Sequence, residues 1–228
     1  MTPTDFAPLV ARALALVPEN AALGLGTGRA AAAFVEALAV QVRGGFRVVG
    51  VPTSEATADL ARRLGVPLTT LDETPELDFA IDGADEVDPR GDLIKGYGGA
   101  LVRERIVAGA ARRFVVLVGS EKLVPALGGR GKLPVEIVPF ARGPVARRLL
   151  TLGLHPELRQ RDGHPVVTDN GDWILDCTVG VLSDPAGLEA KLRATPGVVG
   201  TGLFLGMAPT VLVLSPDGTV TEHPHPER

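Results

Sequence analysis

The segment from residue 78 to residue 106 constrains the fold more than any other part of the sequence. Its apolar run FAI, residues 79–81, is typical of a buried strand and leads directly into the acidic segment DGADE, residues 82–86. Strand interiors in parallel sheets are apolar, and open α/β sheets bind their ligands just beyond the carboxyl ends of the strands. The pattern therefore predicts a strand that delivers carboxylates to a ligand site.

A glycine-containing loop and a helix follow in the same segment. The loop KGYGG, residues 95–99, contains glycines, which adopt positive φ at low cost and let a backbone approach a ligand closely. Together, Asp82, Asp85, Lys95 and the helical Glu104 supply what proton transfer beside a carbonyl needs. One carboxylate takes the proton, another handles hydroxyl groups, and a cation stabilises the oxyanion. The alternative is a solvated turn followed by a surface carboxylate on a helix.

Strands and helices alternate through the first half of the chain, which predicts an α/β domain with a parallel, Rossmann-like sheet. Ser54 is the expected N-cap of one helix and Gly65 its C-terminal stop, although Ser54 also suits a ligand contact. The first helix is expected to be capped by Thr4 or Asp5. The expected helices are 4–17, 29–42, 54–65 and a helix from residue 100, and the expected strands are 21–25, 46–51, 66–70, 78–81 and 113–118.

The turn after the first strand, GLGTGRA at residues 24–30, is typical of a phosphate site, because it presents backbone N–H groups and a helix N-terminus to an anion. A dinucleotide site is the rival interpretation, since Gly26, Gly28 and Ala31 satisfy a relaxed G-x-G-x-x-A pattern. That site needs an acidic residue at the end of the next strand. The first acid there is Glu55, beyond Pro52-Thr53-Ser54, so the sequence favours a monophosphate over a nicotinamide cofactor.

The strand 113–118 delivers Lys122 to the same edge of the sheet, where it is expected to be a site residue rather than a surface charge. Beyond residue 130 the order becomes β-α-β-β-α-β, which predicts a smaller, ferredoxin-like α+β domain. A terminal hairpin, 210–214 and 219–222, is expected to rejoin the first domain. The expected domains are therefore 1–129, completed by 206–228, and 130–205.

Composition excludes several classes of function. The net charge of −4 and the lack of a basic stripe argue against nucleic-acid binding. No apolar run reaches membrane-spanning length, and no signal-peptide pattern is present. The single cysteine, Cys177, suits a reducing cytoplasm. Neither a metal nor another cofactor is expected, because the spacing of the histidines suits no metal site; they are His155, His164, His223 and His225.

These motifs resemble ribose-5-phosphate isomerase of the A type along nearly the whole chain. The matching segments are GLGTGRAAAAF, VPTSEAT, DGADEVD, KGYGGALVRERI, EKLV, KLPVEIVPFA, VTDNGDWILD and PGVVGTGLF. The resemblance implies interconversion of ribose 5-phosphate and ribulose 5-phosphate through an enediol(ate), without a metal, in the non-oxidative pentose phosphate pathway. It also implies a cytoplasmic homodimer or homotetramer whose partner is a small sugar phosphate.

The same resemblance implies roles for individual residues. Glu104 is similar to the base that moves a proton between C2 and C1, and Asp82 and Asp85 to the residues that handle the hydroxyls and ring opening. Lys95 is similar to the residue that stabilises the enediolate. The implied substrate-binding residues are Thr27, Gly28, Arg29, Ala30, Asp82, Gly83, Ala84, Asp85, Lys95, Gly96, Tyr97, Gly98 and Lys122.

The sequence departs from the family pattern at the phosphate contacts. The family's loop commonly has Thr-Gly-Ser-Thr where this chain has Thr27-Gly28-Arg29-Ala30, so two hydroxyls are missing. A lysine often found in the first helix is absent, and Arg12 is the only basic residue there. An aspartate is also missing before Lys122. The alternative function is a sugar-phosphate-sensing domain, but that would need a basic helix-turn-helix, for which the first helix starts too close to Met1.

Overall fold

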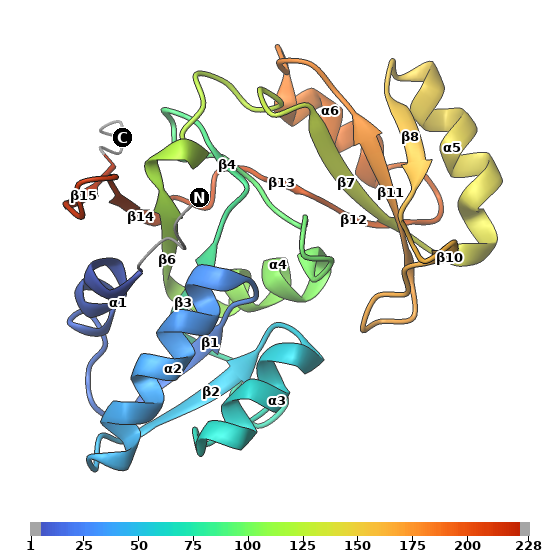
Figure 1. Cartoon of the computed structure of the whole chain (residues 1–228). Helices are drawn as coiled ribbons and strands as arrows, with labels where there is room; N and C mark the ends of the chain where they lie inside the picture. Colours follow the sequence, from blue (N-terminus) through green and yellow to red (C-terminus); the bar gives the residue numbers. More distant parts are fainter. Residues whose placement is uncertain (1–5, 224–228) are drawn as a thin grey trace. The chain divides into compact units, whose positions relative to one another are not determined.

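The computed structural model describes residues 6–223 and divides the chain into two compact units (Figure 1). Of the described residues, the first unit contains 6–84, 103–122 and 207–223, and the second contains 85–102 and 123–206. These units differ from the expected domains, because residues 85–102 and 123–129 group with the second unit. The reason is strand pairing: Glu86–Val87 (β4) and Leu93–Ile94 (β5) form a sheet with Leu203–Phe204 (β13).

The first unit is built on a six-stranded sheet in the order β15-β14-β6-β3-β1-β2. All neighbouring strands are parallel except β15, which returns antiparallel to β14. Register places Leu25 opposite Ile81, and Gly83 opposite Leu117, so three consecutive strands end at the same edge. The strands are Ala21–Leu25 (β1), Val48–Pro52 (β2), Leu77–Gly83 (β3), Ala111–Gly119 (β6), Thr210–Leu214 (β14) and Val220–Glu222 (β15).

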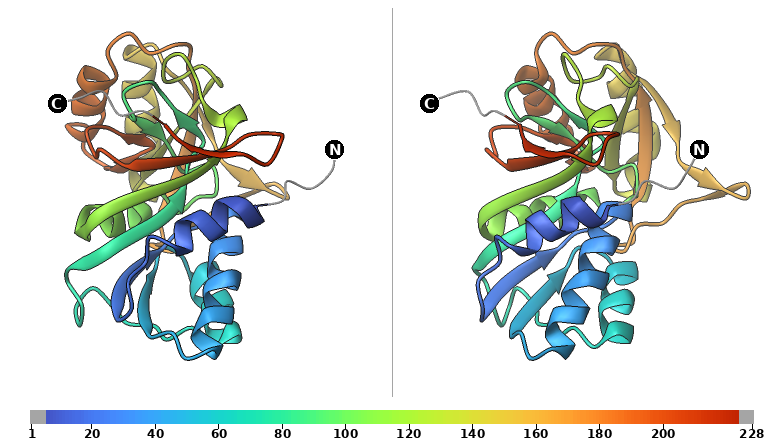
Figure 2. Two further views of the ribbon diagram at one scale, coloured as in Figure 1. Left: turned by 90° about the vertical axis from the view of Figure 1, so that its left-hand side faces the viewer. Right: turned by 60° about the vertical axis from the view of Figure 1, so that its left-hand side comes forward.

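Helices cover both faces of this sheet (Figure 2). Ala7–Leu14 (α1), Arg29–Arg43 (α2) and Glu55–Leu64 (α3) pack on one face around Phe34 and Leu38. Leu101–Ala110 (α4) covers the other face, where Val107 approaches Gly24 so closely that a Cβ on that glycine would lie 2.3 Å from Val107 Cγ1. The parallel sheet and the mixed α/β class predicted from the sequence are confirmed.

Several expected elements differ in extent. The first helix covers Ala7–Leu14, and its expected caps, Thr4 and Asp5, lie outside the described residues. The predicted strand 66–70 is wrong: only Leu68 pairs, in one isolated bridge with Gly50, because Pro67 has no N–H to continue a ladder. The expected cap by Ser54 is confirmed, since its side chain accepts a hydrogen bond from the Thr57 amide.

The second unit contains a four-stranded antiparallel sheet in the order β12-β7-β11-β8, which is the order of a ferredoxin-like β-α-β-β-α-β unit. One face packs on two helices through Leu133, Val135, Leu175 and Cys177. The elements are Lys132–Ile137 (β7), Arg142–Thr151 (α5), His155–Leu158 (β8), Trp173–Thr178 (β11), Pro185–Arg193 (α6) and Val198–Thr201 (β12), with a short 3₁₀ turn at Pro139–Ala141. A second 3₁₀ turn, Ser120–Lys122, lies in the first unit.

Two local details complete the second unit. A small hairpin of Gln160–Arg161 (β9) and His164–Pro165 (β10) follows β8, and one bridge joins Val167 to Trp173. The chain between β12 and β13 is interrupted at Gly202. A Cβ at this position would lie 2.5 Å from Lys95 O, so only glycine allows the chain to pass there.

Candidate active site

Asp82 is the last carboxylate-bearing residue inside β3 and is 3% exposed. The alternative of a solvated turn is therefore wrong for this residue. Its Oδ1 accepts hydrogen bonds from the amides of Gly83, at 2.7 Å, and Thr27, at 3.1 Å. The chain approaches it closely at Gly26, where a Cβ would lie 2.3 Å from Oδ1. Two backbone donors thus fix the orientation of the Asp82 carboxylate.

The hydroxyl of Thr27 lies within a cluster of hydroxyl groups rather than alone at the end of β1. Its Oγ1 is 2.8 Å from both Thr53 Oγ1 and Ser54 Oγ and 3.3 Å from Thr57 Oγ1. Thr57 donates in turn to Gly26 O at 2.9 Å. The helix-capping segment 53–57 therefore supports the loop that contains Thr27.

The rest of the predicted phosphate loop forms the start of α2. Gly28 is the N-cap residue with φ of 108°, and no side chain caps the helix there. Arg29 is exposed at the first helical position, whereas Ala30 is buried. No hydrogen bond or ion pair joins Arg29 to another described residue. The helix therefore begins with backbone N–H groups that no side chain caps, beside a guanidinium, an arrangement that favours an anion.

Glu104 lies in the first turn of α4 and is 4% exposed. It lines the same small crevice as Asp82, together with Gly24, Gly26 and Thr53. The neighbouring Arg103 forms an ion pair with Glu55 of α3 at 2.8 Å, and this contact holds the first turn of α4 against α3. The structure thus brings together two buried carboxylates of the segment 78–106 and excludes Glu104 as an ordinary surface residue.

Lys122 and the segment 83–84 complete the predicted residues of the first unit. Gly83 pairs with Leu117 of β6, and β6 ends at Gly119 immediately before the 3₁₀ turn Ser120–Lys122. Lys122 is partly exposed. It therefore lies at the strand-end edge that also contains Gly83 and Ala84, as the sequence predicted.

Asp85 and the glycine loop belong to the second unit, where they contact each other directly. Asp85 Oδ2 accepts a hydrogen bond from the Tyr97 amide at 2.9 Å. Gly96 has φ of 99°, and its carbonyl accepts the Gly99 amide at 3.0 Å, which closes the turn. Gly98 is exposed at its tip. The loop thus directs one backbone N–H at the carboxylate of Asp85.

Lys95 enters this loop from a fixed position. It is 2% exposed, its amide donates to Gly202 O at 2.9 Å, and its Nζ lies 5.6 Å from the centre of the Phe204 ring. A buried lysine held by backbone pairing is fixed before a substrate arrives, so it needs no reorganisation when negative charge develops nearby. This environment excludes a role for Lys95 as a solvated surface charge.

Tyr97 is half-buried, and its hydroxyl donates to Lys132 O at 3.1 Å. Lys132 Nζ lies 4.8 Å from the centre of its ring. Burial, together with the negative charges of Glu86 and Asp85, raises the pKa of the phenol well above its ordinary value. Tyr97 therefore stays protonated and acts as an anchor of the loop, a role that the sequence left open.

Sequence reasoning missed the side chains that hold the glycine loop from the sheet of the second unit. Arg159 Nη1 donates to Gly96 O at 3.1 Å and to Tyr97 O at 3.2 Å. Asp176 on β11 pairs with Arg159 and with Lys132. One signal was available: Asp176 interrupts the apolar strand WILDC, and a charged residue inside a strand indicates a buried partner.

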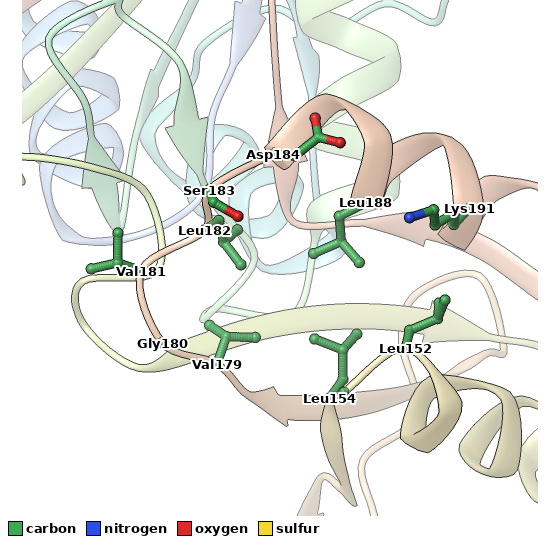
Figure 3. Close-up of a pocket in the computed structure, with 11 residues that line it drawn as sticks. Leu152, Leu154, Val179, Gly180, Val181, Leu182, Ser183, Asp184, Leu188 and Lys191 are labelled. Carbon is green, nitrogen blue, oxygen red and sulfur yellow. The ribbon is translucent and has the colours of Figure 1, made fainter.

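Other possible sites in the described residues carry no comparable chemistry. The second unit holds a cavity of about 290 Å³, lined by leucines and valines with Asp184 and Lys191 at its rim (Figure 3), and none of its residues belongs to the predicted site. Within residues 6–223, no group of three or more His, Cys, Asp or Glu side chains is placed to hold a metal ion. None of the helices in this range combines the length and apolar character that crossing a bilayer requires. His225 lies outside it.

Comparison with known proteins gives the same family from a family model and from individual relatives. A family model described as ribose 5-phosphate isomerase A (phosphoriboisomerase A) matches residues 49–218. Ribose-5-phosphate isomerase A of Roseiflexus sp. (strain RS-1) is 53% identical over 214 residues, covering 92% of each chain.

Solved structures agree with the relatives found by sequence. The ribose 5-phosphate isomerase of Plasmodium falciparum matches with a TM-score of 0.91 at 35% identity, covering 94% of this chain and 95% of that chain. A D-ribose-5-phosphate isomerase solved in complex with phospho-erythronic acid matches with a TM-score of 0.90 at 37% identity, covering 94% and 95%.

Proposed function

The chain belongs to the ribose 5-phosphate isomerase A family, and from this premise we propose how its own residues carry out the reaction. The enzyme interconverts ribose 5-phosphate and ribulose 5-phosphate, an isomerisation of the pentose phosphate pathway. Family membership favours this activity over a sugar-phosphate-sensing domain. The residue roles below are supported by the site geometry and by the matching motifs.

Glu104 is the proposed base. It takes the proton from C2 of the open-chain aldose while O1 gains a proton, which gives an enediol; O2 then loses its proton, and Glu104 returns a proton to C1. The observation that carries this role is that Glu104 and Asp82 are both buried and line one crevice. A buried carboxylate fixed by a helix is well suited to act as a positioned base.

Asp82 and Asp85 are proposed to move the hydroxyl protons and to assist ring opening, while Lys95 stabilises the negative oxygen of the enediolate. Asp82 and Asp85 are both oriented by backbone amides, and Lys95 is buried in a fixed position. Groups oriented before the substrate arrives stabilise developing charge better than mobile ones. The remaining substrate contacts are assigned to Gly83, Ala84, Gly96, Tyr97, Gly98 and Lys122.

The phosphate is proposed to bind at the start of α2, at residues Thr27, Gly28, Arg29 and Ala30. The backbone N–H groups at this helix N-terminus have no side-chain cap and favour an anion, and the exposed Arg29 adds a positive charge. The matched isomerase solved with phospho-erythronic acid supports a phosphorylated sugar acid as a probe. Binding of that compound to this protein is measurable by calorimetry without turnover.

We also propose that the enzyme is a cytoplasmic homodimer or homotetramer. The buried thiol of Cys177 suits a reducing compartment, and the almost fully exposed side chain of Phe140, at 97%, suits an apolar contact between subunits. Sedimentation velocity measures the assembly directly. A monomer at micromolar concentration would contradict this part of the proposal.

Replacing Glu104 by Gln tests the proposed base. The change keeps the shape of the side chain and removes the proton acceptor, so kcat should fall on the order of 10²–10⁴-fold. Glu36→Gln, at an exposed position of α2, is the matched control and should retain wild-type kcat. Near-normal turnover of Glu104→Gln would contradict the assignment, provided that both variants melt as wild type does.

A further inference from the structure

The peptide unit between Gly96 and Tyr97 is held from both sides within the second unit. Its carbonyl, Gly96 O, accepts hydrogen bonds from Arg159 Nη1 at 3.1 Å and from the Gly99 amide at 3.0 Å. Its N–H, on Tyr97, donates to Asp85 Oδ2 at 2.9 Å. Because a peptide unit is planar and rigid, fixing its carbonyl also fixes its N–H. One peptide therefore connects Arg159 to Asp85.

The guanidinium of Arg159 is itself fixed by a carboxylate. Arg159 Nε lies 2.8 Å from Asp176 Oδ2, and Arg159 Nη2 lies 2.5 Å from Oδ1, so the pair is bidentate. Lys132 Nζ adds a contact of 3.1 Å to Asp176 Oδ2. Burial tends to raise the pKa of Asp176, but Arg159 and Lys132 outweigh it and hold this pKa below its ordinary value. The carboxylate is therefore charged at neutral pH, and Nη1 of Arg159 is directed at the loop.

The loop needs an external support because its own sequence provides little stiffness. Gly96 and Gly99 both have positive φ, and glycines restrict the backbone less than any other residue. Arg159 bonds the Tyr97 carbonyl as well, at 3.2 Å. The guanidinium thus bridges two successive carbonyls of the flexible segment, which a single-point lysine ammonium does not reproduce.

We propose that Arg159, oriented by Asp176, is a positioning residue for the isomerisation and acts by fixing the Gly96–Tyr97 peptide that orients Asp85. This inference rests on the role proposed above for Asp85. A group displaced by about 1 Å loses on the order of 10²-fold in rate, so a support of this kind affects turnover without touching the substrate. The side chain of Arg159 can be replaced without removing its strand pairing, because the hydrogen bond from the Arg159 amide to Ile174 O, at 2.8 Å, involves only backbone atoms.

The first measurement compares Arg159→Gln with Arg161→Gln. Arg161 lies two residues further along, is exposed on β9, and serves as the matched control. Arg159→Gln should lower kcat by about 10- to 100-fold and change KM by less than about 3-fold, because the loss affects the transition state rather than substrate binding. Arg161→Gln should behave as wild type. Equal kcat values for wild type and Arg159→Gln would overturn the inference.

The second measurement repeats Arg159→Gln in an Asp85→Asn background, because a general loss of structure also lowers kcat. If Arg159 acts through Asp85, the substitution should cost less than about 3-fold in kcat in the Asp85→Asn enzyme, since residues that act as a unit are not additive. The same fold-loss in both backgrounds would overturn positioning through Asp85. If Arg159→Gln melts below the assay temperature, Arg159→Lys, which keeps the charge without the fork, replaces it in the same cycle.

Different outcomes would contradict the role of Asp85 and the role of Arg159. Wild-type kcat in Asp85→Asn alone would contradict the role proposed for Asp85 and the inference with it. A clear loss in Asp85→Asn, combined with additive losses in the double variant, would leave the proposed function intact and overturn the inference alone. Faster hydrogen exchange of the Tyr97 amide in Arg159→Gln, but not in Arg161→Gln, is the expected structural signature.

Discussion

Asp82 Oδ1 accepts a hydrogen bond from the backbone amide of Thr27 at 3.1 Å, so the turn after β1 is joined directly to the acidic end of β3. The contact requires the two strands to end side by side, and their register provides this, with Leu25 opposite Ile81. The loop proposed for the phosphate and a carboxylate proposed for the reacting end therefore share one support. A disturbance at this point should therefore affect catalysis as well as stability.

Gly26→Ala tests this support. A Cβ at residue 26 would lie 2.3 Å from Asp82 Oδ1 and 2.6 Å from Asp82 Cα, so backbone as well as carboxylate must shift. We expect kcat to fall by at least about 10²-fold and Tm to fall as well, because misplacement and overpacking both carry a cost. Gly109→Ala in α4, where a Cβ meets no atom within 4 Å, is the control and should be neutral or slightly stabilising. Full activity in Gly26→Ala would show that the position of Asp82 is not critical.

The sequence predicted Asp82, Asp85, Lys95 and Glu104 because each follows a local pattern: an apolar run ending in carboxylates, a glycine loop, and a helix start. Such patterns can be recognised within a few residues of sequence. The residues that support these side chains lie far away in the sequence and follow no local pattern. Arg159 contacts Gly96, which lies 63 positions away in the sequence, and no periodicity connects the two residues. Only the three-dimensional arrangement of β8, β11 and the loop reveals this contact.

Element ends were less predictable than element types, again for physical reasons. The sequence placed the end of the central strand at Ile81, because Asp82 and Gly83 are poor strand formers. In the structure β3 continues to Gly83, since pairing with Val116 and Leu117 and the two amide donors outweigh that propensity. The opposite happened at residues 66–70, where apolar residues suggested a strand and Pro67 removed a donor that the ladder needs.

Lys95→Ala distinguishes a role in the reaction from a role in phosphate binding. Because an oxyanion contact strengthens in the transition state, kcat should fall by about 10²–10³-fold while KM changes far less. Lys191→Ala, at an exposed lysine of the same unit, is the control and should be silent. A change confined to KM would make Lys95 a phosphate ligand. The variant also removes a buried side chain beside Phe204, so its Tm must be recorded to confirm that the assay measures folded protein.

Glu136→Gln should be more stable than the wild type, and this difference should grow as pH rises. Glu136 is fully buried on β7, and burial raises its pKa, although hydrogen bonds from Asn170 and Thr168 partly oppose the shift. The folded state therefore binds a proton more tightly than the unfolded chain, in which a glutamate has a pKa of about 4.3. The contribution of Glu136 to the stability of the wild type is therefore fully present below that value and is lost as pH rises through the folded pKa.

The measurement is Tm against pH for both proteins. Gln carries no charge at any pH and keeps an oxygen that accepts both hydrogen bonds, so the advantage of Glu136→Gln should be small at pH 4 and grow toward alkaline pH. Glu157→Gln, at an exposed site on β8, should show no such trend. A Tm difference that is independent of pH would mean that the charge of Glu136 is not what limits stability.

Arg29→Ala tests the proposed phosphate contact at the start of α2. A Ser-Thr pair would offer the phosphate two neutral donors, whereas Arg29 and Ala30 offer one guanidinium beside the exposed N-terminus of α2. A charge-assisted hydrogen bond contributes about 1.5–3 kcal/mol, so KM for ribose 5-phosphate should rise by about 10- to 100-fold with a modest change in kcat. Turnover of unphosphorylated ribose should be unaffected, because that substrate lacks the group that Arg29 contacts.

Arg63→Ala, which replaces an exposed arginine on α3, is the matched control. Both variants should be compared at low salt, where the charge is least screened; equal KM values for wild type and Arg29→Ala under that condition would show that the guanidinium faces water throughout the reaction.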